Sequence, residues 1–171
     1  MLNRNEIRQL VIQHELVSEY IDLEKQLQPS GFDISLQNVH VFTSSGSVDF
    51  SNEEREISTS SPLKPDFEGW WWLPKGCYKI IYNEIVKMPL DVSAIARTRS
   101  TLLRNGASIQ TAVWDPGYRG RSSSLLVVYN PDGIRLKRDA RIAQLIFFNI
   151  KNVEEGYIGK YQNERIPKKG D

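Results

Sequence analysis

The chain has 171 residues, of which 40% are hydrophobic and 25% charged, and its formal net charge at neutral pH is +1. This length and apolar content suit one compact domain, residues 1–171, whose core buries most of the apolar surface. The balanced charge argues against a nucleic-acid backbone or an anionic membrane as the main partner, so an anion must be bound by local groups.

The same sequence predicts a cytoplasmic protein with no membrane partner. Cys77 is the single cysteine, so an internal disulfide is excluded. The first residues, MLNRNE, lack the apolar core of a signal peptide. No apolar run approaches the roughly 20 residues that cross a bilayer.

The N-terminal segment, residues 1–30, has helical periodicity. Apolar residues recur at spacings of three and four at Ile7, Leu10, Val11, Val17, Tyr20 and Ile21. This pattern predicts one amphipathic helix from Glu6 to Leu27. It should stop near Pro29-Ser30-Gly31, because proline disfavours a helical residue before it and glycine permits a turn.

After residue 31 the pattern changes to short segments rich in β-branched and aromatic residues, separated by Pro, Gly, Ser and Asp. There is no internal repeat and no βαβ alternation, which argues against a Rossmann or TIM-barrel architecture. We therefore expect a mainly β domain, a sandwich or barrel, in which the polar residues 44–62 form a surface hairpin or loop.

A second, short helix is predicted within residues 98–106, with Thr98 or Ser100 as its N-cap and an Asn-Gly pair as its stop. Arg99, Ser100 and Thr101 would place a guanidinium and two hydroxyl groups beside unpaired backbone N–H groups at the start of that helix. Such a set suits a phosphate. Taken alone, however, the segment is more often an ordinary capped surface helix.

The segment TAVWDPGY, residues 111–118, reads as a strand that ends in an Asp-Pro-Gly turn. Asp-Pro-Gly is by itself only a turn signal, and structural turns far outnumber catalytic aspartates. The local pattern therefore does not identify Asp115 as a catalytic residue.

The combination of segments is more specific than any one of them. RSTLLR at 99–104, TAVWDPGYRG at 111–120 and RIAQLIFF at 141–148, in that order, resemble the dUTPase and dCTP deaminase superfamily. LQPSGFDISL and LPKGCYKIIYNEIVKMPLD, further upstream, extend the resemblance to about residues 21–164. Members of this superfamily are β-rich, jelly-roll-like homotrimers with active sites at the subunit interfaces. The resemblance thus implies a mainly β, jelly-roll-like distorted barrel or sandwich with an N-terminal amphipathic helix and one short internal helix.

Two reactions occur on this fold, and position 127 separates them. In family deaminases a glutamate stands three residues before an asparagine that matches Asn130, and this sequence has Val127 there. Residues 122–129 contain no acidic side chain that could transfer protons in deamination. The resemblance therefore implies hydrolysis of dUTP to dUMP and pyrophosphate. The alternatives are a dCTP deaminase, a bifunctional deaminase and dUTPase, and a non-catalytic nucleotide-binding trimer.

The resemblance also implies roles for individual residues. Asp115 would orient and deprotonate the water that attacks the α-phosphorus of dUTP. Tyr118 would pack on the deoxyribose and exclude a 2′-hydroxyl, and the backbone of Ala112 and Val113 would read the uracil edge. The triphosphate would be bound by Arg99, Ser100, Thr101, Arg104, Arg141 and Gln144.

A magnesium ion is implied as the cofactor, bridging the phosphate oxygens and keeping several of its own waters. Asp33 is the expected outer-shell carboxylate, acting through water. His14 and His40 stand near no cysteine or carboxylate at ligand spacing, which argues against a zinc site and against a Ser-His-Asp triad.

The C-terminal residues 156–171 are open to two interpretations. Their low apolar content is typical of a mobile tail. Their GYIGKYQ segment instead resembles the lid of deaminase-like dUTPases of the archaeal type, in which Lys160 would approach phosphate and Tyr161 would cover the nucleotide.

Overall fold

The computed structural model describes residues 1–151 and 153–166 of the chain. The helices are α1 (Arg4–His14), α2 (Leu23–Gln26) and α3 (Ser100–Arg104). The strands are β1 (Val17–Ser18), β2 (Leu27–Gln28), β3 (Gly31–Phe42), β4 (Ser60–Pro62), β5 (Trp70–Leu73), β6 (Gly76–Tyr82), β7 (Ile85–Lys87), β8 (Val92–Thr98), β9 (Ala107–Gln110), β10 (Arg119–Gly120), β11 (Ser123–Val128), β12 (Ile134–Lys137) and β13 (Arg141–Asn149).

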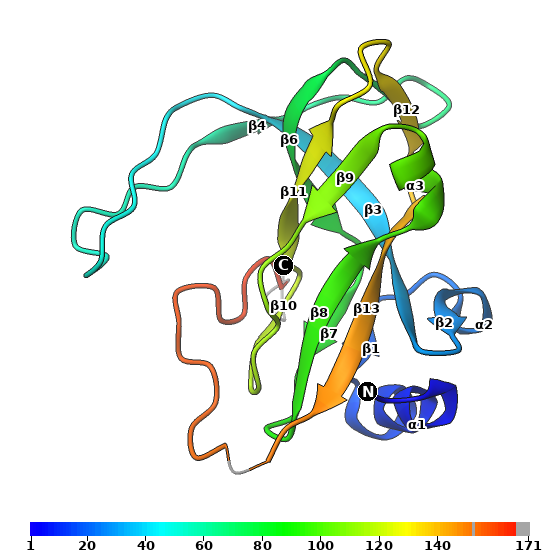
Figure 1. Cartoon of the computed structure of the whole chain (residues 1–171), viewed down its shortest axis with the longest axis vertical. Helices are drawn as coiled ribbons and strands as arrows, with labels where there is room; N and C mark the ends of the chain where they lie inside the picture. The colour runs from blue at the N-terminus through cyan, green and yellow to red at the C-terminus, as the bar shows by residue number, and fades with distance from the viewer. Residues whose placement is uncertain (152, 167–171) are drawn as a thin grey trace.

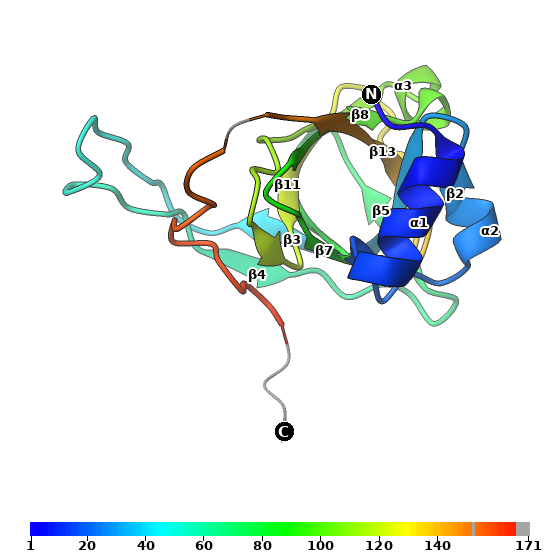
Figure 2. The same cartoon turned by 90° about the horizontal axis from the view of Figure 1, so that it is seen from below.

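The main sheet follows the order β8-β13-β3-β6-β11-β9, with every neighbour antiparallel, and β2 and β4 pair with β3 at its two ends. Seen from below, this sheet curls around a central core into a nearly closed barrel (Figure 2). Two small sheets, β1-β7-β10 and β12-β5, complete it. The predicted mainly β, jelly-roll-like barrel or sandwich is therefore confirmed, in the form of a nearly closed barrel.

Apolar side chains from β3, β6, β11 and β13 fill the barrel. Phe32, Leu36, Ile80, Leu126 and Phe147 are each at most 1% exposed. Burying one such side chain contributes about 1.5–3 kcal/mol relative to leaving it in water, so this cluster supplies the main driving force for closing the sheet.

The predicted helix from Glu6 to Leu27 is wrong in its extent. Helix α1 begins after an Asn3 capping box and ends at His14, because Glu15 adopts a left-handed conformation with φ 55°. The apolar residue Val17, which fits the helical spacing, instead pairs with Val86 in a short sheet. Ile7 and Val11 do form a buried face of α1, which lies across one side of the barrel (Figure 2).

The short internal helix is confirmed, with a correction to its cap. Arg99 is the N-cap of α3, and no side chain caps the helix, so neither Thr98 nor Ser100 has that role. Thr98 instead ends strand β8 and bonds through its hydroxyl to the backbone of Ile109. The turn after the helix is made at Gly106, whose φ of +73° favours glycine.

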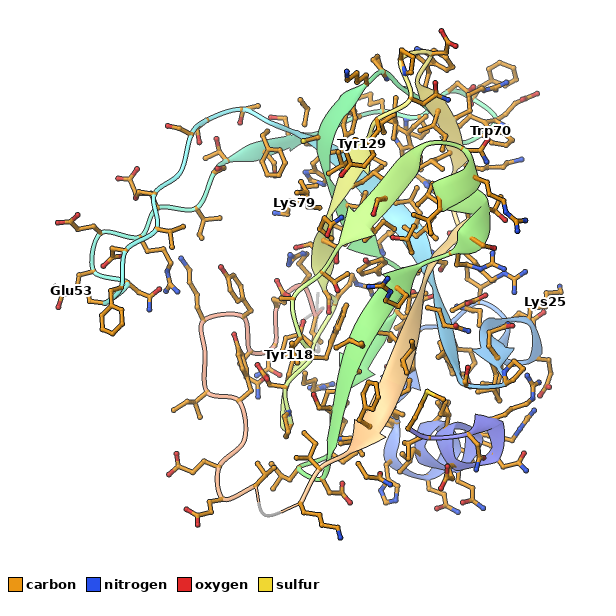
Figure 3. The ribbon with its side chains drawn as sticks, viewed as in Figure 1. Lys25, Glu53, Trp70, Lys79, Tyr118 and Tyr129 are labelled. Atoms are coloured by element: carbon orange, nitrogen blue, oxygen red, sulfur yellow. The ribbon has the colours of Figure 1, made fainter. Side chains whose placement is uncertain are left out.

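Residues 43–59 form the predicted surface hairpin. Ser47 bridges to Glu56, and the hairpin projects far from the barrel between β3 and β4 (Figure 1). Glu53, at its tip, lies far from the barrel (Figure 3). None of the helices in residues 1–151 and 153–166 is both long and apolar enough to cross a membrane.

Candidate active site

A buried carboxylate holds two guanidinium groups where β3, β8 and β13 meet. Asp33 on β3 is 1% exposed, and its Oδ2 lies 3.1 Å from Arg99 Nε and 3.3 Å from Arg141 Nη1. Burial raises the pKa of Asp33, and the charges of the two arginines oppose that rise. Both arginine side chains remain about a third exposed, at 32% and 36%. Their remaining N–H groups can therefore face an anion while Asp33 fixes their positions.

The other residues predicted to bind phosphate lie on α3, which follows Arg99, and on β13, which begins with Arg141. Ser100, Thr101 and Arg104 are exposed on α3, directly after Arg99. Gln144 on β13 pairs with Asp33 in the sheet register and is half-buried. A hollow of about 510 Å³ is lined here by residues that include Trp70, Trp72, Arg99, Thr101, Arg135 and Arg141. We call the residues predicted to bind phosphate, together with Asp33, the phosphate-side cluster.

Strand-like pairing holds the Asp-Pro-Gly turn in place. Trp114 exchanges two backbone hydrogen bonds with Ala94, of 2.9 and 3.0 Å, and its indole Nε1 donates to Ser122 Oγ at 2.7 Å. The chain then turns at Gly117, with φ +80°, and Tyr118 N donates to Asp115 O at 3.1 Å. The buried Trp114 thus anchors a turn that presents Asp115 to solvent.

A second hollow, of about 800 Å³, opens beside this turn. Its lining includes the predicted residues Ala112, Val113, Asp115, Tyr118 and Tyr161, which we call the nucleoside-side cluster. Ala112 and Val113 are exposed and lie outside any strand, so their backbone can bind a base edge. Tyr118 is 7% exposed, and burial raises its pKa. Lys160 is exposed on the tail.

The phosphate-side and nucleoside-side clusters are separate within one chain. The two hollows share no lining residue. In Figure 3, the labelled Trp70 lies on the side of the phosphate-side cluster, and the labelled Tyr118 belongs to the nucleoside-side cluster. Within the described chain, Asp115 therefore lines one hollow, whereas Arg99 and Arg141 line the other.

The side chains around Asp33 could hold a magnesium ion only through water molecules bound to the ion. Across residues 1–151 and 153–166, no group of three or more His, Cys, Asp or Glu side chains is placed to hold a metal ion. Oδ2 of Asp33 is already engaged by two arginines. Magnesium keeps several waters and takes phosphate oxygens readily, so one indirect carboxylate contact is compatible with it.

Sequence reasoning missed a buried residue that supports Asp33. Glu84 is 1% exposed and accepts hydrogen bonds from Gln26 Nε2 at 2.6 Å, Ser35 N at 2.9 Å and Ser35 Oγ at 2.6 Å. Gln26 Nε2 also donates to the backbone oxygen of Asp33 at 2.9 Å. Burial raises the pKa of Glu84. A single glutamate between Asn and Ile carries no local signal of such a role.

The strand that carries position 127 offers no acidic side chain. Val127 lies half-buried on β11 between its cross-strand partners Cys77 and Ser108. None of the β11 residues, Ser123–Val128, is acidic.

Known proteins resemble this chain in sequence and in fold. A family model described as dCTP deaminase-like matches residues 1–150. A protein of Methanosarcina mazei named "Probable deoxyuridine 5'-triphosphate nucleotidohydrolase" is 49% identical over 166 residues, covering 96% of this chain and 97% of that protein. The "Deoxyuridine 5'-triphosphate nucleotidohydrolase" of Methanocaldococcus jannaschii is 35% identical over 140 residues, covering 81% of this chain and 88% of that protein.

A crystal structure of 2'-deoxycytidine 5'-triphosphate deaminase from Agrobacterium tumefaciens superposes with a TM-score of 0.65 at 22% identity. The match covers 87% of this chain and 47% of that chain, so this chain spans about half of that structure's length. The likeness shows the class of fold: this chain forms the same kind of barrel as that structure.

The sequence matches go further than the fold. The chain belongs to the dCTP deaminase-like family, and proteins named as dUTP nucleotidohydrolases are among its relatives. The resemblance expected from the three segments is thereby confirmed.

Proposed function

We propose that the protein is a dUTP diphosphatase that hydrolyses dUTP to dUMP and pyrophosphate in the cytoplasm. The observation that carries the proposal is the pairing of a solvent-facing Asp115 beside the nucleoside hollow with Val127 on an acid-free β11. The first supplies a base for water, and the second leaves the position of the deaminase glutamate without an acid/base. The names of the relatives support the same reaction.

In this mechanism Asp115 accepts a proton from the water that attacks the α-phosphorus. Arg99 and Arg141, held by Asp33, offset the negative charge that redistributes over the triphosphate, together with Ser100, Thr101, Arg104 and Gln144. A bound magnesium ion would neutralise phosphate oxygens, with Asp33 reaching it through water.

The nucleoside side of the site selects the substrate. The backbone at Ala112 and Val113 reads the uracil edge, and the ring of Tyr118 packs on the deoxyribose where a 2′-hydroxyl would lie. On the tail, Lys160 approaches phosphate and Tyr161 covers the nucleotide from the rim of the same hollow.

The test of the reaction is to supply the purified protein with dUTP and, separately, with dCTP, each with magnesium, and to follow pyrophosphate and ammonia together. We expect pyrophosphate from dUTP and no ammonia from dCTP. Ammonia from dCTP would favour the deaminase or bifunctional alternative, with Glu164 or Glu56 in the hollow as the candidate acid/base. Dissociable binding of dUTP without either product would favour a non-catalytic nucleotide-binding trimer.

The separation of the phosphate-side and nucleoside-side clusters supports a homotrimer. In such a trimer each site takes the phosphate-side cluster from one subunit and the nucleoside-side cluster from its neighbour. A cyclic trimer repeats the same contact at every interface. Such sharing would bring Asp115 of one copy to Arg99 and Ser100 of the next.

Mixed trimers test this sharing. Asp115→Asn and Arg99→Ala chains carrying different tags would be produced together, and the mixed trimers isolated. In a cyclic mixed trimer, one interface joins an intact Asp115 to an intact Arg99, so activity should return to about one third of wild type per trimer. If each chain built its own site, every mixed trimer would stay as inactive as its parents.

A further inference from the structure

The C-terminal tail runs alongside the catalytic turn. Tyr157 N donates to Pro116 O at 2.7 Å, and Asn163 N donates to Arg119 O at 2.7 Å. Arg121 N donates to Glu164 O at 3.0 Å, and Glu164 forms a parallel bridge with Gly120. The tail up to Arg165 is thus attached to the segment that carries Asp115 and Tyr118, whereas residues 167–171 lie outside the described residues.

Gln162 connects the tail to both sides of Tyr118. Its Oε1 accepts from Arg119 N at 2.8 Å, and its Nε2 donates to Gly117 O at 2.9 Å. A side-chain amide here replaces the hydrogen bonds that a neighbouring strand would make. The backbone of Tyr118 is therefore fixed from its preceding and following residues.

Glu164 contacts the opposite end of the same tyrosine. Tyr118 OH donates to Glu164 Oε1 at 2.9 Å and lies 3.1 Å from Ser122 Oγ (the tyrosine is labelled in Figure 3). Arg165 forms an ion pair with Glu164, and its Nη2 donates to Ser123 Oγ at 2.7 Å. Because the carboxylate is anchored to β11 in this way, it is a fixed acceptor rather than a mobile surface charge.

The ring between these two anchors is closely packed. The rings of Tyr118 and Tyr157 meet edge to face at a centroid distance of 5.6 Å and an interplanar angle of 79°. A tyrosine side chain turns about two torsions, so fixing the backbone at one end and the hydroxyl at the other leaves it a single orientation. The tail therefore sets which face of Tyr118 lines the hollow.

We propose that Glu164 is a positioning residue that fixes the ring of Tyr118 and so sets the discrimination of 2′-deoxyribonucleotides against ribonucleotides. The inference rests on the proposed function for the place of the sugar. It deepens that function, since the residue that limits space at the 2′ position is itself held by a carboxylate from the tail. Without Glu164, the tyrosine hydroxyl keeps its contact with Ser122 but loses its charged partner, so the ring can move away from the sugar.

The test compares kcat/KM for dUTP and for UTP in Glu164→Ala, Tyr118→Phe and the double variant. We expect Glu164→Ala to lower the dUTP preference about ten-fold, the effect of losing one hydrogen bond to a charged group. Tyr118→Phe removes the hydroxyl and keeps the ring, so it should have a similar effect. Because both changes remove the same contact, Glu164→Ala should change the preference little further in the Tyr118→Phe protein.

Further variants separate positioning from folding. Glu164→Gln keeps an oxygen that accepts from Tyr118 and should retain most of the dUTP preference. Glu155→Ala, at an exposed tail glutamate, is the matched control and should leave the preference unchanged. An unchanged dUTP preference in Glu164→Ala, or an equal loss with and without the tyrosine hydroxyl, would overturn the proposal.

The test remains decisive if the proposed reaction fails. In that case the same variants would be titrated with dUMP and UMP, which need no turnover. Loss of dUMP-over-UMP preference in Glu164→Ala would support the positioning role in a protein that binds nucleotides without hydrolysing them. An equal preference in wild type and Glu164→Ala would reject the role for either function.

Discussion

Asp115→Asn is expected to lower kcat for dUTP by about 10²- to 10⁴-fold, the usual contribution of a general base. The amide is similar in size to the carboxylate, but it cannot accept a proton from water. The side chain is exposed, and the turn is held by backbone bonds and by Trp114, so folding should be unaffected. Pyrophosphate release measures the loss, and calorimetric titration with dUTP checks that binding persists.

Asp132→Asn is the matched control, because Asp132 is an exposed aspartate in a turn outside both hollows. It should hydrolyse dUTP at the wild-type rate. An Asp115→Asn protein with normal turnover would contradict the assigned base. A protein that loses dUTP binding together with turnover would show that Asp115 serves to bind rather than to activate water.

Arg99→Ala is expected to have two large effects from one change. Removing a cation that faces the triphosphate should lower kcat/KM for dUTP by about 10²- to 10³-fold. It also leaves the buried Asp33 with Arg141 as its remaining guanidinium partner, which should lower the free energy of unfolding by about 1–3 kcal/mol. Steady-state kinetics and urea unfolding measure the two effects separately.

Arg97→Ala provides the comparison, because Arg97 is exposed near the end of β8, two residues before Arg99. It should change the free energy of unfolding by about 0.5 kcal/mol or less, as surface substitutions usually do. Equal kinetics in Arg97→Ala and Arg99→Ala would indicate a general charge effect and would contradict a specific role for Arg99.

Much of the fold was predictable because short apolar segments between turn residues leave few alternatives to a β-sandwich or a β-barrel. The segment around residues 99–104 likewise formed a helix where one was predicted. The exact end of the first helix was not predictable from periodicity. Val17 fits the helical spacing, but pairing with Val86, far away in sequence, decides its structure.

The structure brings some of the predicted site residues into contact and separates others, and the sequence did not indicate this arrangement. The family resemblance implied that Asp33, Arg99 and Arg141 belong to one site, and the sheet register brings them into contact. Nothing in a linear pattern indicates that Glu84 supports Asp33 from a distant turn, or that Glu164 reaches Tyr118. Both are lone carboxylates whose partners are set by tertiary packing.

Val127 also bears on how the two reactions of this fold could exchange during evolution. Valine and glutamate codons can differ at a single base, and position 127 is half-buried between Cys77 and Ser108 rather than enclosed in the core. A carboxylate there would not have to displace the apolar side chains that close the barrel. A change at position 127 can therefore arise without a change of fold, so this position can vary between related proteins that share the barrel.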